Sequence, residues 1–250
     1  MIFLRLLSAV YFSVLVTFIT LILFFLTCLC QLMIPVWGLR KTQDQIHRIA
    51  SFWGWFIMEA MPIWRIEIIG RPQVDPSKPV VFVANHQSMA DIWAMFCTWQ
   101  NFRWIAKSSL FHIPAVGQAM RWAGYVSVKR GDVASHASAM IAAADVLKSG
   151  RSMFFFPEGT RSVDGKVKKF KLGAFRLATQ LSCDVVPIVI TGAGQLLPKG
   201  TFLPAKATVR VEFLEKILLE KFGDDPQKIA DACQSKIIER LATLPALGKK

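Results

Sequence analysis

Acidic residues are scarce in this 250-residue chain, where 17 Asp and Glu stand against 30 Lys and Arg and the formal net charge is +13. Tyrosine is also rare, with 2 residues against 19 Phe and 8 Trp, a bias that favours apolar contact over polar recognition. Hydrophobic residues make up 53% of the chain, and the mean hydropathy is +0.40. Nucleic acid and phospholipid surfaces are the two main anionic partners of a basic protein. The high apolar content favours the lipid surface.

Motifs of several other protein classes are missing from the sequence. There is no Gly-x-Ser-x-Gly elbow, which argues against a serine lipase or esterase. The 4 His residues lack His-Glu-x-x-His or similar spacing, so no metal site is predicted. Helix-turn-helix, zinc and RNA-binding signatures are missing too, so no nucleic-acid partner is predicted. The 5 Cys residues are scattered and odd in number, which indicates reduced cysteines in a cytosol-facing protein.

No charge occurs between Arg5 and Arg40, and the stretch from Leu6 to Trp37 is almost entirely apolar. About 20 such residues cross the hydrocarbon core of a bilayer, so this tract is predicted to be a membrane anchor. A cleaved signal peptide would have a shorter apolar region ending in small residues. Lys41 and Arg48 add positive charge after the tract, so the rest of the chain is predicted on the cytoplasmic face of the cell inner membrane or an equivalent membrane.

A second apolar stretch, from Ile46 to Trp64, contains His47, Arg48 and Glu59 and is too polar for a membrane span. An interfacial helix fits it better, as does the return arm of a shallow hairpin with the first tract. Whether the first tract crosses the membrane or dips into one leaflet is open. The domain organisation predicted from these patterns is a membrane-anchoring helical segment over residues 1–64 and a catalytic domain over residues 65–250.

After residue 65, short apolar runs typical of strands alternate with helical patterns. The predicted strands cover residues 79–84, 124–129, 152–156, 185–191 and 207–214. Helices are predicted after residue 88, over residues 134–147 and 171–181, and after the cap at Asp225-Pro226. Lys107 lies on a less regular segment and, taken alone, is expected at the surface. The fold class predicted is α/β, with a mixed, largely parallel sheet flanked by helices and an active site beyond the carboxyl ends of its strands.

His86 follows the first of these strands in the turn Asn85-His86-Gln87-Ser88, and Asp91 lies in the first turn of the next helix. A strand–turn–helix corner allows Asp91 to accept a hydrogen bond from one imidazole nitrogen, which leaves the other nitrogen to take a proton from a hydroxyl. Ser88 and Asp91 also have the spacing of a helix capping box. Asp91 is therefore a candidate for either role, and the two roles are compatible.

Cationic side chains follow two more of the predicted strands. Arg161 lies in the sharp turn Phe156-Pro157-Glu158-Gly159-Thr160-Arg161-Ser162, and a guanidinium suits bidentate contact with a phosphate. Lysines at 166, 168, 169 and 171 make the following segment more basic than one phosphate requires, which docking on anionic lipid explains. Arg130 follows the strand at 124–129. A general base facing a phosphate-bearing substrate is as far as the residues alone lead.

Four motifs in order resemble the glycerolipid acyltransferase family, especially its 1-acyl-glycerol-3-phosphate (lysophosphatidic acid) acyltransferases. The four blocks are Asn85-His86-Gln87-Ser88-Met89-Ala90-Asp91, Gly124-Tyr125-Val126-Ser127-Val128-Lys129-Arg130, Phe156-Pro157-Glu158-Gly159-Thr160-Arg161-Ser162 and Val186-Pro187-Ile188-Val189-Ile190. The resemblance covers about residues 66–215 of the chain. The apolar segment before the blocks is similar to the membrane-engaging helices of the family.

The resemblance implies that His86 is the general base and Asp91 its orienting partner. It further implies that the sn-2 hydroxyl of lysophosphatidic acid attacks the thioester of acyl-CoA or acyl-carrier protein directly, with no other cofactor and no metal. Glu158, Gly159 and Arg161 are then expected to hold the glycerol phosphate, helped by two further cations, Arg130 and Lys107. The four blocks leave open another acceptor: glycerol 3-phosphate, a different lysophospholipid or an acylated amino-acid lipid.

Overall fold

A seven-stranded sheet with the order β1-β7-β6-β2-β5-β3-β4 forms the centre of the computed structural model, which describes residues 2–72, 74–75, 78–162, 165–196 and 204–244. Its strands are β1 Trp64–Ile69, β2 Val81–Ala84, β3 Phe102–Lys107, β4 Val126–Val128, β5 Ser152–Phe155, β6 Val185–Thr191 and β7 Ala207–Phe213. The strands from β6 to β4 along this order are parallel, whereas β7 runs antiparallel to β6 and β1 runs parallel to β7. The prediction of a mixed, largely parallel sheet is confirmed.

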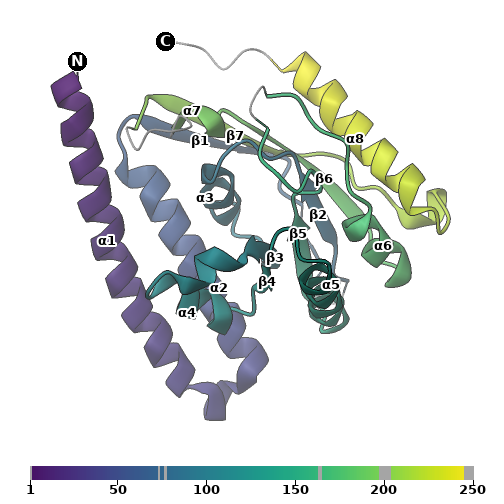
Figure 1. Cartoon of the computed structure of the whole chain (residues 1–250), viewed down its shortest axis with the longest axis horizontal. Helices are drawn as coiled ribbons and strands as arrows, with labels where there is room; N and C mark the ends of the chain where they lie inside the picture. The colour runs from purple at the N-terminus through teal and green to yellow at the C-terminus, as the bar shows by residue number, and fades with distance from the viewer. Residues whose placement is uncertain (1, 73, 76–77, 163–164, 197–203, 245–250) are drawn as a thin grey trace.

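Helices cover both faces of the sheet, and Figure 1 shows α1 and α2 on one side of it and α5, α6 and α8 on the other. The helices are α1 Ile2–Leu32, α2 Ile34–Ala60, α3 Ala90–Phe96, α4 Val116–Trp122, α5 Val133–Lys148, α6 Gly173–Gln180, α7 Ala193–Leu196 and α8 Pro226–Thr243, with 3-10 turns η1 Ser108–His112 and η2 Leu219–Lys221. Two apolar cores lie on opposite faces of the sheet. The first is formed with α1, α2, α3, α4 and α7, and the second with α5, α6 and α8. Strands covered on both faces consist of nearly continuous apolar residues, as in β2 and β5, where every residue is buried.

Two strands were missed by the sequence patterns. β1 lies at the sheet edge, where Trp64 is buried, Ile66 and Ile68 are half-buried and the residues between them are exposed. β3 reads Phe-Arg-Trp-Ile-Ala-Lys and carries a charge at two of its positions. Lys107 is the last residue of β3, so its expected place on an irregular segment is wrong. The physical reason is that Arg103, which interrupts the apolar pattern, is fully buried and paired with Asp44.

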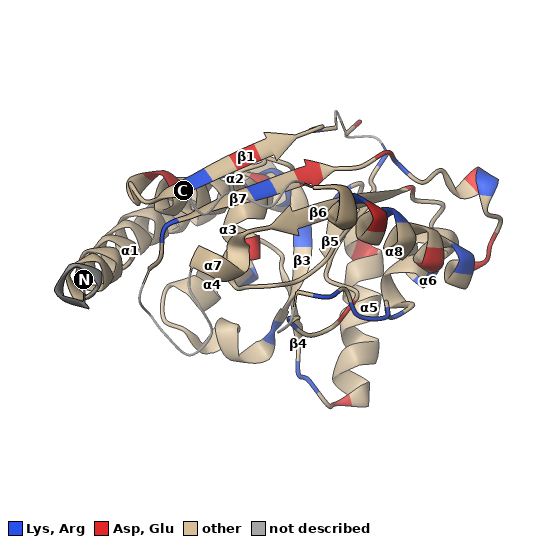
Figure 2. Ribbon diagram, turned by 90° about the horizontal axis from the view of Figure 1, so that it is seen from above, with Lys and Arg blue, Asp and Glu red and all other residues tan. Residues whose placement is uncertain are grey.

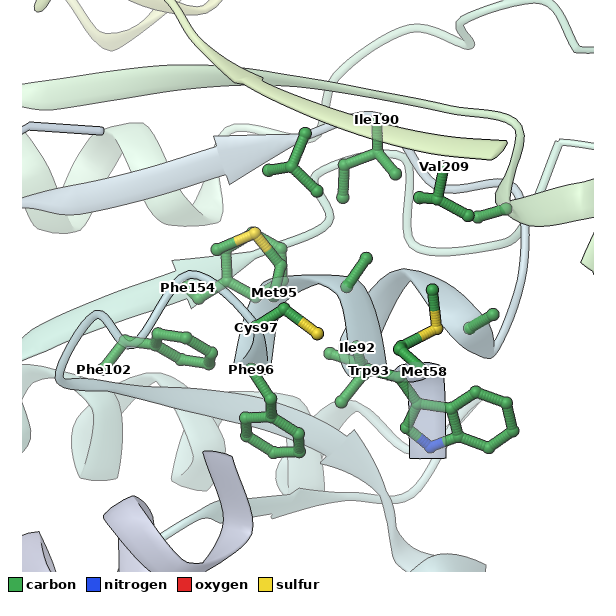
Figure 3. Packing of buried hydrophobic residues seen from close by; sticks show 14 of the residues in the cluster. Met58, Ile92, Trp93, Met95, Phe96, Cys97, Phe102, Phe154, Ile190 and Val209 are labelled. Atoms are coloured by element: carbon green, nitrogen blue, oxygen red, sulfur yellow. The ribbon is translucent and has the colours of Figure 1, made fainter. Parts of the chain in front are cut away.

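The short helix α3 is buried on all sides. Figure 3 shows its residues Ile92, Trp93, Met95 and Phe96 packed among Phe102, Phe154, Ile190 and Val209 of the strands and Met58 of α2. All residues of α3 from Ala90 to Phe96 are less than 10% exposed. Because protein interiors are close-packed, a helix held on every side has little freedom to shift or rotate. α3 is therefore a rigid support for the residue in its first turn, Asp91.

The long apolar tract at the amino end forms a helix that stops at Leu32, earlier than the uncharged stretch suggested. Pro35 lies in the first turn of the next helix, which begins at Ile34, and Gly38 interrupts that helix with a left-handed backbone at φ 75°. Proline starts a helix readily, and glycine adopts a positive φ without a steric penalty, so the two residues together turn the chain back. α2 then runs back beside α1 as the return arm of a helical hairpin (Figure 1).

One face of α1 packs along α2 and the α/β part of the chain. Phe12 contacts the rings of Trp64 and Trp93, and Phe24 stacks on Trp122 at 5.7 Å. The opposite face exposes large apolar side chains from Leu6 to Leu32, and charged segments lie mainly on other elements (Figure 2). Among the described residues, Leu6–Leu32 is long and apolar enough to cross a membrane, with a mean hydropathy of 2.6.

A buried histidine ties α2 to the sheet. His47 Nε2 lies 2.8 Å from the carbonyl oxygen of Gln100, and Nδ1 lies 2.8 Å from the hydroxyl of Tyr125. Because a carbonyl oxygen only accepts, Nε2 carries the proton and Nδ1 accepts from the tyrosine. Burial, together with the charge of Arg103, lowers the pKa of His47 to about 3. The ring is therefore neutral in the folded chain at every pH near neutrality.

Acidification is expected to lower the free energy of unfolding through His47. His47 stays neutral in the folded chain, whereas in the unfolded chain it takes up a proton below pH 6.5. The contribution of His47 to the free energy of unfolding is therefore fully present above pH 6.5 and is lost as the pH falls toward 3. The expected loss is about 1.4 kcal/mol per pH unit in this window. Denaturant unfolding in detergent at pH 7 and pH 5.5 measures it. His47→Gln should reduce the difference between the two values, and an unchanged difference would contradict the assignment.

Candidate active site

The carboxyl ends of four neighbouring parallel strands bring the predicted site residues to one edge of the sheet. His86 follows β2, the turn with Glu158 and Arg161 follows β5, Lys107 ends β3 and Arg130 follows β4. In parallel sheets this edge is where ligands bind. The neighbouring order β2-β5-β3-β4 places the imidazole at one end of this row and the cations along the rest of it.

His86 and Asp91 meet at the corner between β2 and α3. The Nδ1 atom of His86 lies 2.7 Å from Oδ2 of Asp91, whose side chain is fully buried. Since a carboxylate only accepts, Nδ1 carries the proton and Nε2 has its lone pair free. Nε2 has no hydrogen-bond partner among the described residues, and the side chain of His86 is 13% exposed. The geometry is that of a general base held in one tautomer and open to a substrate.

Asp91 also closes the first turn of α3. Its Oδ2 accepts the backbone N–H groups of Gln87 at 2.7 Å and Ser88 at 2.9 Å, in addition to the imidazole. The Ser88 hydroxyl accepts the N–H of Ala90 in return at 3.3 Å. One arm of the capping box is present, because Asp91 accepts the N–H of Ser88, whereas the Ser88 hydroxyl bonds to Ala90 and not to Asp91. The same carboxylate oxygen therefore orients the imidazole and holds the turn that leads into α3.

An aromatic ring covers one face of His86, which the sequence patterns did not indicate. The ring of Phe156, just after β5, stacks on the imidazole at a centroid distance of 3.9 Å with an angle of 15° between the planes. Stacking adds a second restraint to the ring orientation, beyond the bond to Asp91. A ring face near an imidazolium also stabilises its positive charge. Phe156 thus restrains the ring in both of its protonation states.

Glu158 links two loops of the site through hydrogen bonds to their backbones. Its Oε1 accepts the backbone N–H of His86 at 2.8 Å, and its Oε2 accepts that of Lys168 at 2.9 Å. The side chain is 4% exposed. A carboxylate with both oxygens held by backbone amides has little capacity left for a substrate, and its charge repels a phosphate. In the structure, Glu158 bonds to the loops that contain His86 and Lys168. The contact between Glu158 and the substrate that the resemblance implies stays a prediction.

Asn85 joins the same loop to β6. Its Nδ2 donates to the carbonyl oxygen of Ile190 at 2.8 Å, and its Oδ1 accepts the N–H of Ile190 at 2.9 Å. The side chain is 2% exposed. A buried amide that uses both its donor and its acceptor in this way fixes the backbone on either side. The residue before His86 is therefore locked to a central strand.

The turn after β5 presents Arg161 to solvent. Gly159 has φ 71°, a left-handed backbone that favours glycine, whereas the nearest atoms to an added Cβ belong to the flexible end of Lys171, which can move aside. Lys168 donates from Nζ to the carbonyl oxygen of Arg161 at 3.2 Å. Lys168, one of the lysines after this turn, therefore helps to hold the turn itself. Arg161 itself is exposed, as are Lys107 and Arg130 further along the edge.

The arrangement supports proton abstraction next to bound negative charge. A neutral imidazole with one free nitrogen can accept a proton from a hydroxyl, and the carboxylate behind it stabilises the imidazolium that forms. Exposed guanidinium and ammonium groups along the same edge can bind a phosphate. Two cavities among the described residues lie away from His86, at the end of the sheet where β2, β3 and β5 begin.

Comparison with known proteins places the sequence among acyltransferases. A family model described as acyltransferase matches residues 65–191. A 1-acyl-sn-glycerol-3-phosphate acyltransferase of Chlamydomonas reinhardtii is 40% identical, with 63% of this chain and 48% of the relative covered. A chloroplastic enzyme of that name from Brassica napus is 35% identical, with coverage of 78% and 56%. The chain thus spans about half the length of these two relatives. One from Limnanthes douglasii is 30% identical, with coverage of 81% and 72%.

Among solved structures, the 1-acyl-sn-glycerophosphate (LPA) acyltransferase of Thermotoga maritima has the same fold. The TM-score is 0.78 at 24% sequence identity, and the match covers 97% of this chain and 98% of the other. The match includes the amino-terminal hairpin as well as the sheet, because it covers nearly the whole chain. The family model spans β1 to β6 and with them His86, Asp91 and the turn at Arg161. The chain belongs to the acyltransferase family.

Proposed function

We propose that the chain transfers a fatty acyl group from acyl-CoA or acyl-carrier protein to the sn-2 hydroxyl of 1-acylglycerol 3-phosphate, giving phosphatidic acid. The observation that carries this proposal is the 2.7 Å contact between His86 and Asp91 at a sheet edge that also presents Arg161, Lys107 and Arg130. The names of the three relatives support the choice of acceptor. Several lipids share a phosphate and a free hydroxyl, and a panel of acceptors distinguishes them.

In the proposed reaction, Nε2 of His86 takes the proton of the sn-2 hydroxyl as its oxygen attacks the thioester carbonyl carbon. The tetrahedral intermediate then collapses, the C–S bond breaks and the thiol leaves with the proton from the imidazolium. Asp91 holds the ring and stabilises its positive charge between these two steps. No acyl-enzyme forms, so neither Ser88 nor Cys97 acts as a nucleophile; both are buried.

The membrane is the proposed source of the acceptor. The outer face of α1 exposes apolar side chains from Leu6 to Leu32, while its inner face packs on α2 and the α/β part. A helix attached lengthwise in this manner suits insertion along one leaflet, with the site at the lipid surface. The positive charge that follows the apolar tract favours the cytoplasmic face of an inner membrane or its equivalent.

Acyl transfer by purified chain in detergent tests the proposed function. Lysophosphatidic acid and labelled acyl-CoA or acyl-carrier protein are incubated with it, and the lipid product is identified by mass. Glycerol 3-phosphate, lysophosphatidylcholine and an acylated amino-acid lipid serve as competing acceptors. Phosphatidic acid as the main product supports the proposal, whereas a clear preference for an acceptor without a phosphate monoester would contradict it.

Arg161→Ala is expected to raise the KM for lysophosphatidic acid by about tenfold or more, because a charge-assisted bond to the phosphate is lost. The maximal rate and the KM for the acyl donor should change little. Steady-state kinetics with each substrate varied in turn measures the difference. Arg176→Ala removes an exposed arginine of α6 as a matched control. An unchanged KM for the acceptor would exclude Arg161 from phosphate binding.

A further inference from the structure

Two buried arginines share one carboxylate at the edge of the sheet opposite His86. Arg103, on β3, is 0% exposed, and its Nη2 lies 2.6 Å from Oδ1 of Asp44 on α2. Arg151, just before β5, is 8% exposed, and its Nε lies 3.1 Å from the same oxygen. Burial and the charge of Arg103 lower the pKa of Arg151. One carboxylate thus faces two guanidinium groups in a region largely shielded from water.

More positive charge surrounds this trio. Arg40 is close enough to add to the lowered pKa of Arg151. Lys41 and Arg48 are exposed on the same helix as Asp44, one turn before it and one turn after it. Uncompensated buried charge is costly, and an additional anion offsets that cost. The cluster therefore has a local excess of positive charge that its single carboxylate does not neutralise.

A cavity of about 390 Å³ opens beside the cluster, and its volume is in the range of small-ligand sites. Its lining residues are Lys41, Asp44, Gln45, His47, Arg48, Ser51, Trp99 and Asn101. Trp99 is 46% exposed and has a backbone φ of 57°, a left-handed conformation that is unfavourable for a side chain of this size. The lining thus combines cations, hydrogen-bond donors and an exposed indole.

The cavity is separate from the acceptor site. Asn101 precedes β3 and Arg151 precedes β5, so the cluster lies at the amino ends of these strands, whereas Glu158 and Arg161 follow the carboxyl end of β5. The four residues of β5 that separate the two ends span roughly 13 Å at the usual rise per residue. A small ligand at the amino ends of the strands does not reach their carboxyl ends, so both sites can be occupied together.

We propose that this cavity is a second anion site, which binds a phosphate group at Lys41 and Arg48 apart from the acyl acceptor. The phosphate is either the head group of an anionic lipid such as phosphatidic acid or a free inorganic ion. The excess charge around Asp44 attracts it, Gln45 and Asn101 supply polar groups, and Trp99 adds an indole to the lining. Trp side chains are common at membrane–water interfaces, which suits a lipid source next to the helical hairpin.

Fluorine NMR of the full chain in detergent tests the proposal. The chain is labelled with 5-fluorotryptophan, and Trp99→Phe assigns the resonance of Trp99. Inorganic phosphate and short-chain phosphatidic acid are titrated separately, with phosphatidylcholine in the same micelles as the lipid without net charge. A saturable shift of the Trp99 resonance with inorganic phosphate identifies a free anion as sufficient. A shift with phosphatidic acid alone identifies the lipid head group.

Variants decide whether the binding depends on the cavity. Lys41→Ala with Arg48→Ala should weaken the affinity of the bound probe by about tenfold or more. Arg176→Ala with Lys228→Ala removes two exposed cations of α6 and α8 and should leave the affinity unchanged. His86→Ala should leave it unchanged as well. The proposal is overturned if neither probe moves the Trp99 resonance, or if the Lys41 and Arg48 double variant binds as well as the parent chain.

Discussion

Replacing His86 with alanine is expected to lower the rate of acyl transfer by about 10²- to 10⁴-fold while the chain stays folded. The expected loss follows from the geometry of the imidazole. Its Nδ1 is bonded to Asp91 and its Nε2 is free, so the ring is the one group at the corner of β2 and α3 that is placed to take a proton from a hydroxyl. Without it, the acceptor alcohol must attack the thioester while still protonated. The maximal rate with saturating lysophosphatidic acid and acyl-CoA measures the effect.

The fold of the His86→Ala variant is expected to persist because the backbone of residue 86, not its side chain, joins the loops of the site. The backbone N–H of His86 donates to Glu158, and its carbonyl oxygen accepts the N–H of Ser162 at 2.8 Å. The variant should therefore unfold at nearly the same temperature as the parent. His136→Ala, at an exposed position of α5, is the matched control. A His86→Ala variant that retains more than a tenth of the parent rate would rule out general-base catalysis by this residue.

Strands that are buried on both faces were the easiest part of the fold to predict. β2, β5 and β6 are short apolar runs bounded by polar or turn residues, and the sequence pattern located each of them within about two residues, the usual limit for element ends. β3 was missed because Arg103 interrupts its apolar pattern, and the partner that makes its burial tolerable, Asp44, lies on a helix far away in the sequence. Pairing of this kind is set by tertiary structure, which local patterns do not contain.

The helix break at Met33 had a local signal that the uncharged stretch concealed. Hydropathy over residues 6–37 is continuous, yet Pro35 and Gly38 together end one helix and turn the next. The insertion of β7 between β1 and β6 had no such signal. β7 runs antiparallel to β6 and parallel to β1, and its place between them is set by tertiary packing and not by local propensity.

The residues that carry chemistry were predictable because they occupy strand ends in short ordered motifs. The residues that hold them were not predicted in those roles. Asn85 and Phe156 lie inside the same motifs as His86 and Arg161, but their contacts are with a strand and a ring more than 60 positions away. Glu158 was assigned to the substrate by resemblance, and its two oxygens bond to backbone amides in the structure. Sequence spacing reveals which side chains are near a site and leaves open what each one touches.

Asp91→Asn is expected to lower the maximal rate by on the order of 10²-fold or more, with little change in the KM for either substrate. An asparagine can place its carbonyl oxygen where Oδ2 now accepts His86, Gln87 and Ser88, so the loop geometry is kept. Its amide then takes the place of Oδ1, which is buried and has no partner among the described residues. The substitution removes the negative charge that stabilises the imidazolium and leaves the shape of the site nearly intact.

Asp91→Ala separates the two functions of this carboxylate. It removes the charge and also leaves the buried N–H groups of Gln87 and Ser88 without an acceptor, so it should cost about 1–3 kcal/mol of stability beyond the loss of rate. Asp225 caps α8 in the same manner, accepting the N–H groups of Gln227 and Lys228, and is remote from the site. Asp225→Ala should lower the unfolding temperature and leave the rate unchanged. If Asp91→Asn keeps the parent rate, Asp91 serves only to hold the turn, and His86 works without its charge.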